Sequence, residues 1–176
     1  MLYTIGHSTR TYAELVEVLR AWEVTRLIDI RSITRSRTNP QFNEVRLSRQ
    51  LPAKRIAYEV MLDLGGRRPR SKTADPARNA GWRVQAFHNY ADYAETPEFA
   101  RALARLLARS AKETCAIMCA EAVWWRCHRR IVADYAIARG AKVSHIFTGT
   151  KIERATRTPF GKLDCKTKTL RYPPVL

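Results

Sequence analysis

The sequence predicts an α/β fold of three layers, in which helices flank a mostly parallel sheet of about five strands. Short β-prone segments alternate with segments whose apolar residues recur at helical spacing, which is the pattern of strand–helix–strand units. The chain has 176 residues, of which 45% are hydrophobic, and this is enough for one full core. We therefore expect one α/β domain over residues 1–148 and a basic C-terminal extension, a hairpin or a tail, over residues 149–176.

The first half of the chain contains three predicted strands and two predicted helices. The first strand ends at Gly6, and Tyr12, Leu15 and Leu19 then share one face of a helix. Pro52 ends the second, shorter helix. A strand, an amphipathic helix and another strand in succession favour a right-handed parallel unit. The predicted ranges are a strand at 2–5, a helix at 12–22, a strand at 27–30, a helix at 43–51 and a strand at 55–60.

The second half of the chain adds three predicted helices and two predicted strands. Pro97 stands at a typical first helical position, and Gly140 is a typical C-terminal stop. On the helix that Pro97 begins, Arg101, Arg105 and Arg109 recur every four residues and predict a charged face. The predicted ranges are a helix at 84–94, a helix from 97, a strand at 115–119, a helix at 126–139 and a strand at 141–147.

The strongest signal in the composition is positive charge. Lys and Arg total 32 against 16 Asp and Glu, so the formal net charge is +16. Such an imbalance favours polyanionic partners, namely nucleic acid, phosphorylated metabolites or anionic lipid. The alternative is a basic surface that reflects an arginine-rich proteome and makes no specific contact.

The sequence also restricts the compartment in which we expect the protein. No apolar run is long enough to span a bilayer, and residues 1–7 lack the basic flank and long apolar centre of a secretory signal. We therefore expect a soluble cytoplasmic protein with no membrane partner. In that compartment the four cysteines are expected to be free thiols. The sequence identifies neither a cofactor nor an oligomeric state.

Chemically versatile residues gather where the predicted strands end. Residues 115–130 alone contain three of the four cysteines, one histidine and three arginines. In an open parallel sheet, ligands bind at the carboxyl ends of the strands, so the loops there should form one composite pocket. The candidate catalytic residues are Cys119, Glu121, His128 and His7. The candidate binding residues are Ser8, Arg31, Arg37, Arg126, Cys127, Arg129 and Trp125.

One chemistry open to this set is nucleophilic attack by a cysteine. A cysteine at a strand end with basic neighbours can act as a thiolate. Cys119 with Arg126 is similar to the Cys–loop–Arg cradle of phosphatases and rhodaneses. Against this similarity, six residues instead of five separate the two, and Glu121 would repel a bound oxyanion. The structural alternative is that Cys119 is a small apolar residue of a buried strand.

Other roles are open to the same residues. The spacing from Cys119 to Cys127 and His128 fits no standard zinc finger, and on a helix the last two side chains would point about 100° apart, so we assign no metal ligand. Glu121 can instead form a buried ion pair with an arginine, Arg129 or Arg31, that holds the loops together. The tryptophans at 124 and 125 can stack on a nucleic-acid base or cover the core.

The chain resembles the DUF488 family in several ordered blocks. These are Thr4-Ile5-Gly6-His7-Ser8, Asp29-Ile30-Arg31, Ser36-Arg37, Phe42-Asn43, Tyr58, Leu64-Gly65-Gly66, Met118-Cys119-Ala120-Glu121 and Cys127-His128-Arg129. The resemblance extends from the N-terminus to His145-Ile146. It implies a single intracellular α/β domain and marks these blocks as the site. It implies no reaction, because the family is named for its unestablished function.

Two hypotheses of different class follow. In the first, which we prefer from the sequence, the protein binds nucleic acid or another polyanion, and its strand-end pocket recognises a phosphate or a base. In the second, it is a small-molecule enzyme that uses Cys119 or Cys127 with Glu121 and His128, with or without a metal.

Overall fold

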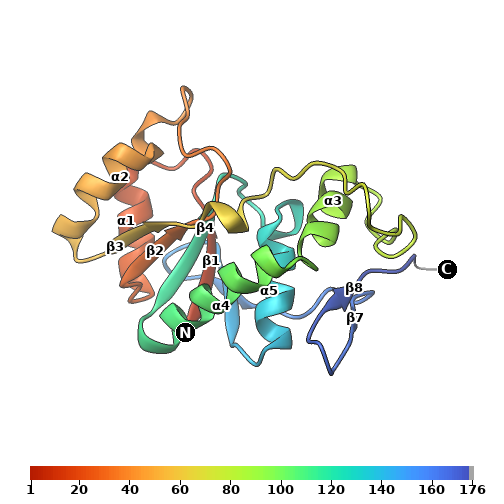
Figure 1. Ribbon diagram of the computed structural model, residues 1–176. Coiled ribbons are helices and arrows are strands. Elements are labelled where there is room, and N and C mark those ends of the chain that lie inside the picture. The colour runs from red at the N-terminus through yellow and green to blue at the C-terminus, as the bar shows by residue number, and fades with distance from the viewer. Residues whose placement is uncertain (175–176) are drawn as a thin grey trace.

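The structure is a computed structural model that describes residues 1–174; the last two residues of the predicted C-terminal extension lie outside this range. Its centre is a six-stranded sheet in the order β3-β2-β4-β1-β5-β6 (Figure 1). Neighbouring strands are parallel except for β5 and β6, which are antiparallel. The predicted three-layer α/β fold is therefore confirmed, with one strand more than the five expected. The strands are β1 (Leu2–Gly6), β2 (Arg26–Asp29), β3 (Ala57–Val60), β4 (Cys115–Cys119), β5 (Val143–Ile146) and β6 (Ile152–Arg154).

Helices cover both faces of this sheet (Figure 1). On one face, α1 and α2 bury Leu15, Leu19 and Leu47 in a common core. On the other face, α3, α4 and α5 contribute to a second core that contains Tyr90 and Phe99. Four short 3-10 helices, η1 to η4, lie in the connections. The bounds are α1 (Tyr12–Ala21), α2 (Glu44–Gln50), α3 (Gln85–Tyr93), α4 (Pro97–Lys112), α5 (Arg129–Ala138), η1 (Pro40–Phe42), η2 (Pro52–Lys54), η3 (Leu62–Leu64) and η4 (Trp124–Arg126).

Local sequence signals account for where these helices begin. The N-cap of α1 is Thr11, which forms a capping box with Glu14. The N-cap of α4 is Thr96, and Pro97 follows at the first helical position, as the sequence predicts. None of the helices in residues 1–174 is both long and apolar enough to cross a membrane.

The central strand β4 positions the first of the thiols. All five of its residues are buried, as expected for a parallel strand that is covered on both faces. Its side chains alternate, so that Ile117 enters one core and Met118 the other. Cys119 is its last residue and lies opposite Gly6 of β1. The strand therefore ends at the sheet edge where ligands of parallel sheets bind.

Two predicted boundaries are wrong for local reasons. β3 begins at Ala57 instead of residue 55, because Arg55 takes a left-handed conformation (φ 62°) at the end of η2. Helix α5 begins at Arg129 instead of Arg126, because η4 is a separate turn and Cys127 after it is extended (φ −133°, ψ 146°). This second difference changes the chemistry of the site, since Cys127 is not a helical residue.

The C-terminal segment continues the fold beyond residue 148. Strand β6 pairs with the edge of the sheet, and β7 (Lys162–Leu163) and β8 (Leu170–Arg171) form a small antiparallel pair. After β8, the buried Tyr172 hydroxyl donates a hydrogen bond to Asp134 of α5 at 2.9 Å. The segment is therefore packed on the same face of the sheet as α5. Strand β6 was not predicted, because its three residues are exposed and mostly polar.

Candidate functional site

Loops from several strand ends surround a pocket of about 360 Å³. The segments after β2, η3 and β4 line it, together with residues near the starts of α3 and α5. Its lining combines cations, apolar side chains and thiols. The cations are Arg31, Arg67 and Arg126, the apolar side chains include Ile33, Val84 and Phe87, and the remaining reactive groups are Cys119, Glu121, Cys127 and His128.

Two buried thiols meet in this pocket. The Sγ atoms of Cys119 and Cys127 lie 2.7 Å apart, and both cysteines are free. Cys119 is 2% exposed and Cys127 is 3% exposed. The two residues meet because β4 delivers Cys119 at its end and the extended Cys127 immediately precedes α5. The structure thus presents a dithiol with little access to solvent.

A buried guanidinium lies against this dithiol. Arg129 is 1% exposed, and its Nη1 donates to Cys119 Sγ at 2.5 Å. The other hydrogen bonds of its side chain go to the main-chain carbonyl oxygens of Glu121 (2.7 Å) and Ala122 (3.0 Å). Within residues 1–174, no carboxylate forms an ion pair with Arg129. The acidic group in contact with this buried cation is therefore the Cys119 thiol.

The surroundings shift the pKa values of the two thiols in opposite directions. Burial raises the pKa of Cys119, but the hydrogen bond from Cys127 and the charge of Arg129 outweigh it, so the pKa is lowered. The pKa of Cys127 is raised well above its ordinary value, by burial and by the neighbouring Cys119. Cys115, at the other end of β4, has its pKa raised to about 11, chiefly by burial. The arrangement favours a thiolate at Cys119 beside a thiol at Cys127.

His128 lies on the other side of Cys127. Its Nε2 is 3.1 Å from the carbonyl oxygen of Ile30, and because a carbonyl only accepts hydrogen bonds, Nε2 carries the proton. Nδ1 is then a free acceptor, 3.5 Å from Cys127 Sγ. Burial lowers the pKa of His128 to about 4, so the ring is neutral at pH 7. The expectation that Cys127 and His128 are neighbours on a helix is wrong, because Cys127 is extended and α5 begins only at Arg129.

A glycine makes room for this histidine. A Cβ atom placed on Gly66 would lie 2.3 Å from His128 Nδ1, so only glycine allows the loop after η3 to approach the ring. A second close approach occurs at Gly6, where a Cβ would lie 1.8 Å from the carbonyl oxygen of Glu121. That carbonyl is one that Arg129 holds. Both glycines therefore shape the loops around the thiols.

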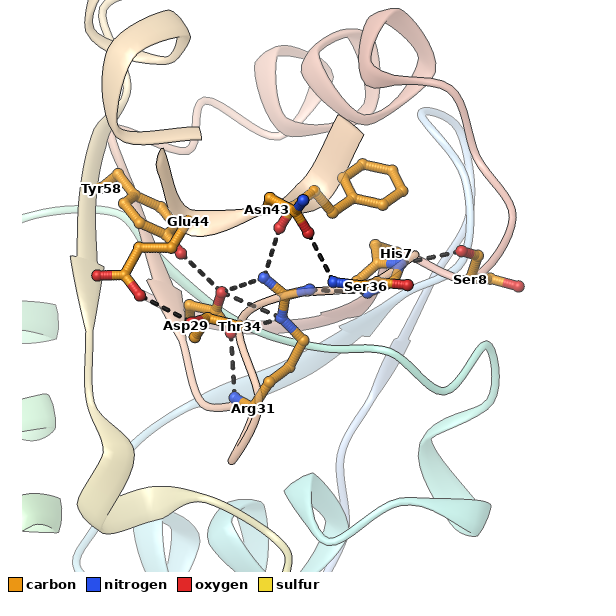
Figure 2. A network of polar contacts seen from close by, with 10 residues as sticks. His7, Ser8, Asp29, Arg31, Thr34, Ser36, Asn43, Glu44 and Tyr58 are labelled. Atoms are coloured by element: carbon orange, nitrogen blue, oxygen red, sulfur yellow. Dashed lines mark hydrogen bonds and ion pairs between the residues drawn. The ribbon is translucent and has the colours of Figure 1, made fainter. Parts of the chain in front are cut away.

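A buried ion pair supports the pocket from the side of β2. Figure 2 shows the guanidinium of Arg31 against the carboxylate of Asp29, with Nε 2.9 Å from Oδ1 and Nη2 2.5 Å from Oδ2. The Tyr58 hydroxyl donates to the same carboxylate at 2.7 Å. Arg31 Nη2 also donates to the carbonyl oxygen of Phe42 at 2.6 Å. This network fixes the start of the loop that carries Ser32 and Ile33 into the pocket.

His7 belongs to this supporting network and does not line the pocket. Its Nδ1 donates to the carbonyl oxygen of Ser8 at 2.9 Å, so its Nε2 is the acceptor that Arg31 Nη1 approaches at 3.3 Å (Figure 2). Its ring packs against Phe42, with centroids 4.3 Å apart. Burial lowers the pKa of His7 to about 4. The structure therefore places this candidate catalytic residue as a neutral packing and hydrogen-bonding group.

The acidic and basic candidates near β4 take different positions from those expected. The Glu121 side chain is exposed at the pocket, and its main-chain carbonyl, not its carboxylate, contacts Arg129. The alternative of a buried Glu121–arginine ion pair is not formed in residues 1–174. Arg126 is also exposed at the pocket. The arginine that meets Cys119 is Arg129, three residues further on.

Four binding candidates lie outside the pocket lining, namely Arg129, which contacts Cys119 from its buried position, and Ser8, Arg37 and Trp125. Ser8 has a left-handed backbone (φ 49°), and its N–H donates to the Ala120 carbonyl at 3.0 Å. Arg37 is exposed on the loop after β2. Trp125 is 46% exposed, with its ring edge-on to Trp124. In the described part of the chain, no group of three or more His, Cys, Asp or Glu side chains could hold a metal ion.

The pocket also contains residues that the sequence did not single out. Arg67 directly follows Leu64-Gly65-Gly66, a block of the family resemblance, so its position was within reach of prediction. Phe87 and Val84 had no such signal, because an apolar residue near a helix start is usually part of the core. Val84 is nevertheless an exposed large apolar side chain.

A family model with the description "Domain of unknown function DUF488" matches residues 11–136. This range covers more than half of the chain and contains both thiols and Arg129. It does not include the Gly6-His7-Ser8 block or the His145-Ile146 end of the resemblance found in the sequence. No curated protein and no solved structure matches the chain.

Proposed function

The chain belongs to the DUF488 family, and we propose that its strand-end pocket is a thiol-based active site in which the Cys119 thiolate attacks a small-molecule electrophile. The family description names no reaction, so the support for this proposal is the geometry of the pocket and its thiols. It takes up the second of the two hypotheses from the sequence, with Arg129 in the role expected of Arg126.

The contact between Arg129 and Cys119 carries the proposal. A buried cation is costly unless an anion or several good acceptors compensate it. Here two carbonyl oxygens and one sulfur surround the guanidinium, and the thiolate is the only one of these groups that can supply a full negative charge. A thiolate, unlike a thiol, is the nucleophilic form of cysteine. The fold thus stabilises the reactive form at the pocket.

The rest of the pocket suits a small organic anion. Arg67 and Arg126 are exposed cations at the pocket, while Ile33, Val84 and Phe87 supply apolar surface. A ligand with an anionic group and an apolar part would contact both. The Glu121 carboxylate is exposed, so solvent and salt screen its repulsion of such a ligand.

A thiolate titration tests this proposal. We expect the ultraviolet absorbance of wild-type protein, minus that of the Cys119→Ser variant, to titrate with a midpoint below the ordinary thiol value of about 8.5. Arg129 is the physical cause, since its charge favours the ionised form. The variants Cys115→Ser and Cys165→Ser serve as controls and should keep the low midpoint. A midpoint at or above the ordinary value would rule out a stabilised thiolate, and with it the proposed function.

Nucleic-acid binding is a second candidate function. The surface that we propose for it is formed by the loops on the pocket side. On α4 the stripe is paired with acids: Arg101 with Glu98, Arg105 with Asp63 and Arg109 with Glu59. This pairing reduces the field expected from that face. Four arginines in the loops on the pocket side, Arg35, Arg37, Arg67 and Arg126, are exposed and have no ion pair in residues 1–174; other exposed arginines without an ion pair, such as Arg46 and Arg157, lie elsewhere on the chain.

A salt titration of binding to a short DNA duplex tests this candidate. If the four loop arginines each neutralise a phosphate, affinity should fall about a hundredfold between 50 and 200 mM salt. Replacing Arg35 and Arg37 by alanine should lower the slope of log affinity against log salt by about two. The matched control replaces Arg101 and Arg105, whose charges are already paired, and should change the slope less. Absence of binding at low salt would eliminate this candidate.

A further inference from the structure

The burial of Cys119 limits the electrophiles that can reach it. Its side chain lines the pocket but is only 2% exposed. A carbon electrophile brings several substituents toward the sulfur, and such a contact does not fit this exposure. The terminal oxygen of a hydroperoxide carries a single hydrogen and is among the smallest electrophilic centres. The access to Cys119 therefore favours attack on a peroxide oxygen.

The position of Cys127 supplies the second half of such a reaction. Its Sγ is already 2.7 Å from Cys119 Sγ, and a disulfide bond is about 2.05 Å long. The sulfenic acid that a peroxide leaves on a cysteine condenses with a neighbouring thiol to a disulfide. In this pocket the neighbouring thiol is already in contact with Cys119. His128 Nδ1 lies 3.5 Å from Cys127 Sγ and helps to hold that sulfur in place.

We propose that the Cys119–Cys127 pair reduces hydroperoxides, with Cys119 as the attacking thiolate and Cys127 as the resolving thiol. This inference rests on the proposed function, since it names the substrate class of the same thiolate. Arg129 and Cys127 both touch the reacting sulfur. His128 acts as a positioning residue through Cys127.

Peroxide reduction at this pair takes two steps, followed by reduction of the disulfide. The Cys119 thiolate attacks the terminal oxygen of ROOH, the O–O bond breaks, and the leaving alkoxide takes a proton from solvent to become ROH. Cys119 is then a sulfenic acid. The Cys127 sulfur attacks the Cys119 sulfur, the S–O bond breaks, and the hydroxyl leaves as water with the Cys127 proton. A small dithiol reduces the resulting disulfide by thiol–disulfide exchange and is itself oxidised to a disulfide.

The experiment follows the oxidation of the full, reduced chain by hydrogen peroxide at pH 7, with mass spectrometry of each cysteine. We expect the wild type to lose two hydrogen atoms and to yield a Cys119–Cys127 disulfide that a small dithiol reverses. Cys165 is exposed and provides an internal reference. Cys119 should react about tenfold faster than Cys165, because an ordinary thiol with a pKa of about 8.5 is only about 3% ionised at this pH.

Variants separate the two thiols. Cys127→Ser should accumulate a sulfenic acid at Cys119, detected as the gain of one oxygen atom on that residue, and Cys119→Ser should form neither product. Cys165→Ser is the matched control and should behave as the wild type. Circular dichroism checks that each variant is folded. If a variant is not folded, the oxidation rates of Cys119 and Cys165 in the wild type still test the proposal.

The outcomes distinguish the inference from the proposed function. A low thiolate midpoint in the titration, without faster oxidation of Cys119 than of Cys165, would overturn peroxide reduction and leave the thiol active site standing. Oxidation of Cys119 that stops at sulfenic acid in the wild type would overturn the role of Cys127. An ordinary midpoint would overturn both.

Discussion

Replacing Arg129 by methionine is expected to raise the pKa of Cys119 by about one to three units, because an adjacent opposite charge shifts a titrating group by that much. The guanidinium donates directly to the sulfur, so the substitution removes both a charge and a hydrogen bond. Each unit corresponds to about 1.4 kcal/mol of preference for the thiolate. The measurement is the thiolate absorbance of the variant as a function of pH.

The matched control for this experiment is Arg126→Met. Arg126 is exposed and lines the same pocket, whereas the guanidinium that donates to Cys119 belongs to Arg129, so the midpoint should stay within a few tenths of a unit. Arg129→Lys should give an intermediate value, since lysine keeps the charge but cannot reach the sulfur and two carbonyls as a planar fork. An unchanged midpoint in Arg129→Met would show that Arg129 only holds the loop through Glu121 and Ala122.

Replacing Asp29 by alanine should lower the free energy of unfolding by about 3–5 kcal/mol, because it leaves the buried Arg31 without its counter-charge. Arg31 and Asp29 are both buried, and the pair also anchors Tyr58 (Figure 2). Denaturant unfolding followed by circular dichroism measures the loss. Reduced thiol reactivity should accompany it, since the loop after β2 forms part of the pocket.

An exposed ion pair of the same chain provides the control. Asp63 and Arg105 are 3.9 Å apart, and both side chains are more than half exposed, so Asp63→Ala should cost no more than about 1 kcal/mol. The double variant Asp29→Ala with Arg31→Met should recover part of the loss, because no buried charge remains unpaired. A cost for Asp29→Ala as small as that of the control would contradict the anchoring role of the network.

Most of the fold followed from local patterns. The helical spacing of Leu15 and Leu19 and the cap at Thr11 specify α1 without reference to the rest of the chain. The apolar run at Cys115–Cys119 is typical of a central parallel strand, and the structure buries it completely. Strand β6 was not predicted, because an exposed edge strand lacks the apolar run that identified β4.

The site was predictable in location but not in detail. Strand ends meet at one edge of a parallel sheet, and Cys119, Cys127 and His128 are indeed together there, as are Arg31 and Arg126. Which arginine meets the thiol depended on the start of α5. With Cys127 extended and the helix beginning at Arg129, the guanidinium of Arg129 turns toward Cys119 and Arg126 remains at the surface.

The sequence by itself determined the α/β architecture, the order of its main elements and the edge at which reactive side chains gather, because periodicity and chain stops act over a few residues. Only the tertiary structure decided that Cys119 and Cys127 touch and that His7 belongs to the Arg31 network. It also decided that Arg129 lies beside the thiols with no ion pair to a carboxylate in residues 1–174. Those contacts join residues on different elements. Their distances depend on backbone angles and packing that no spacing in the sequence records.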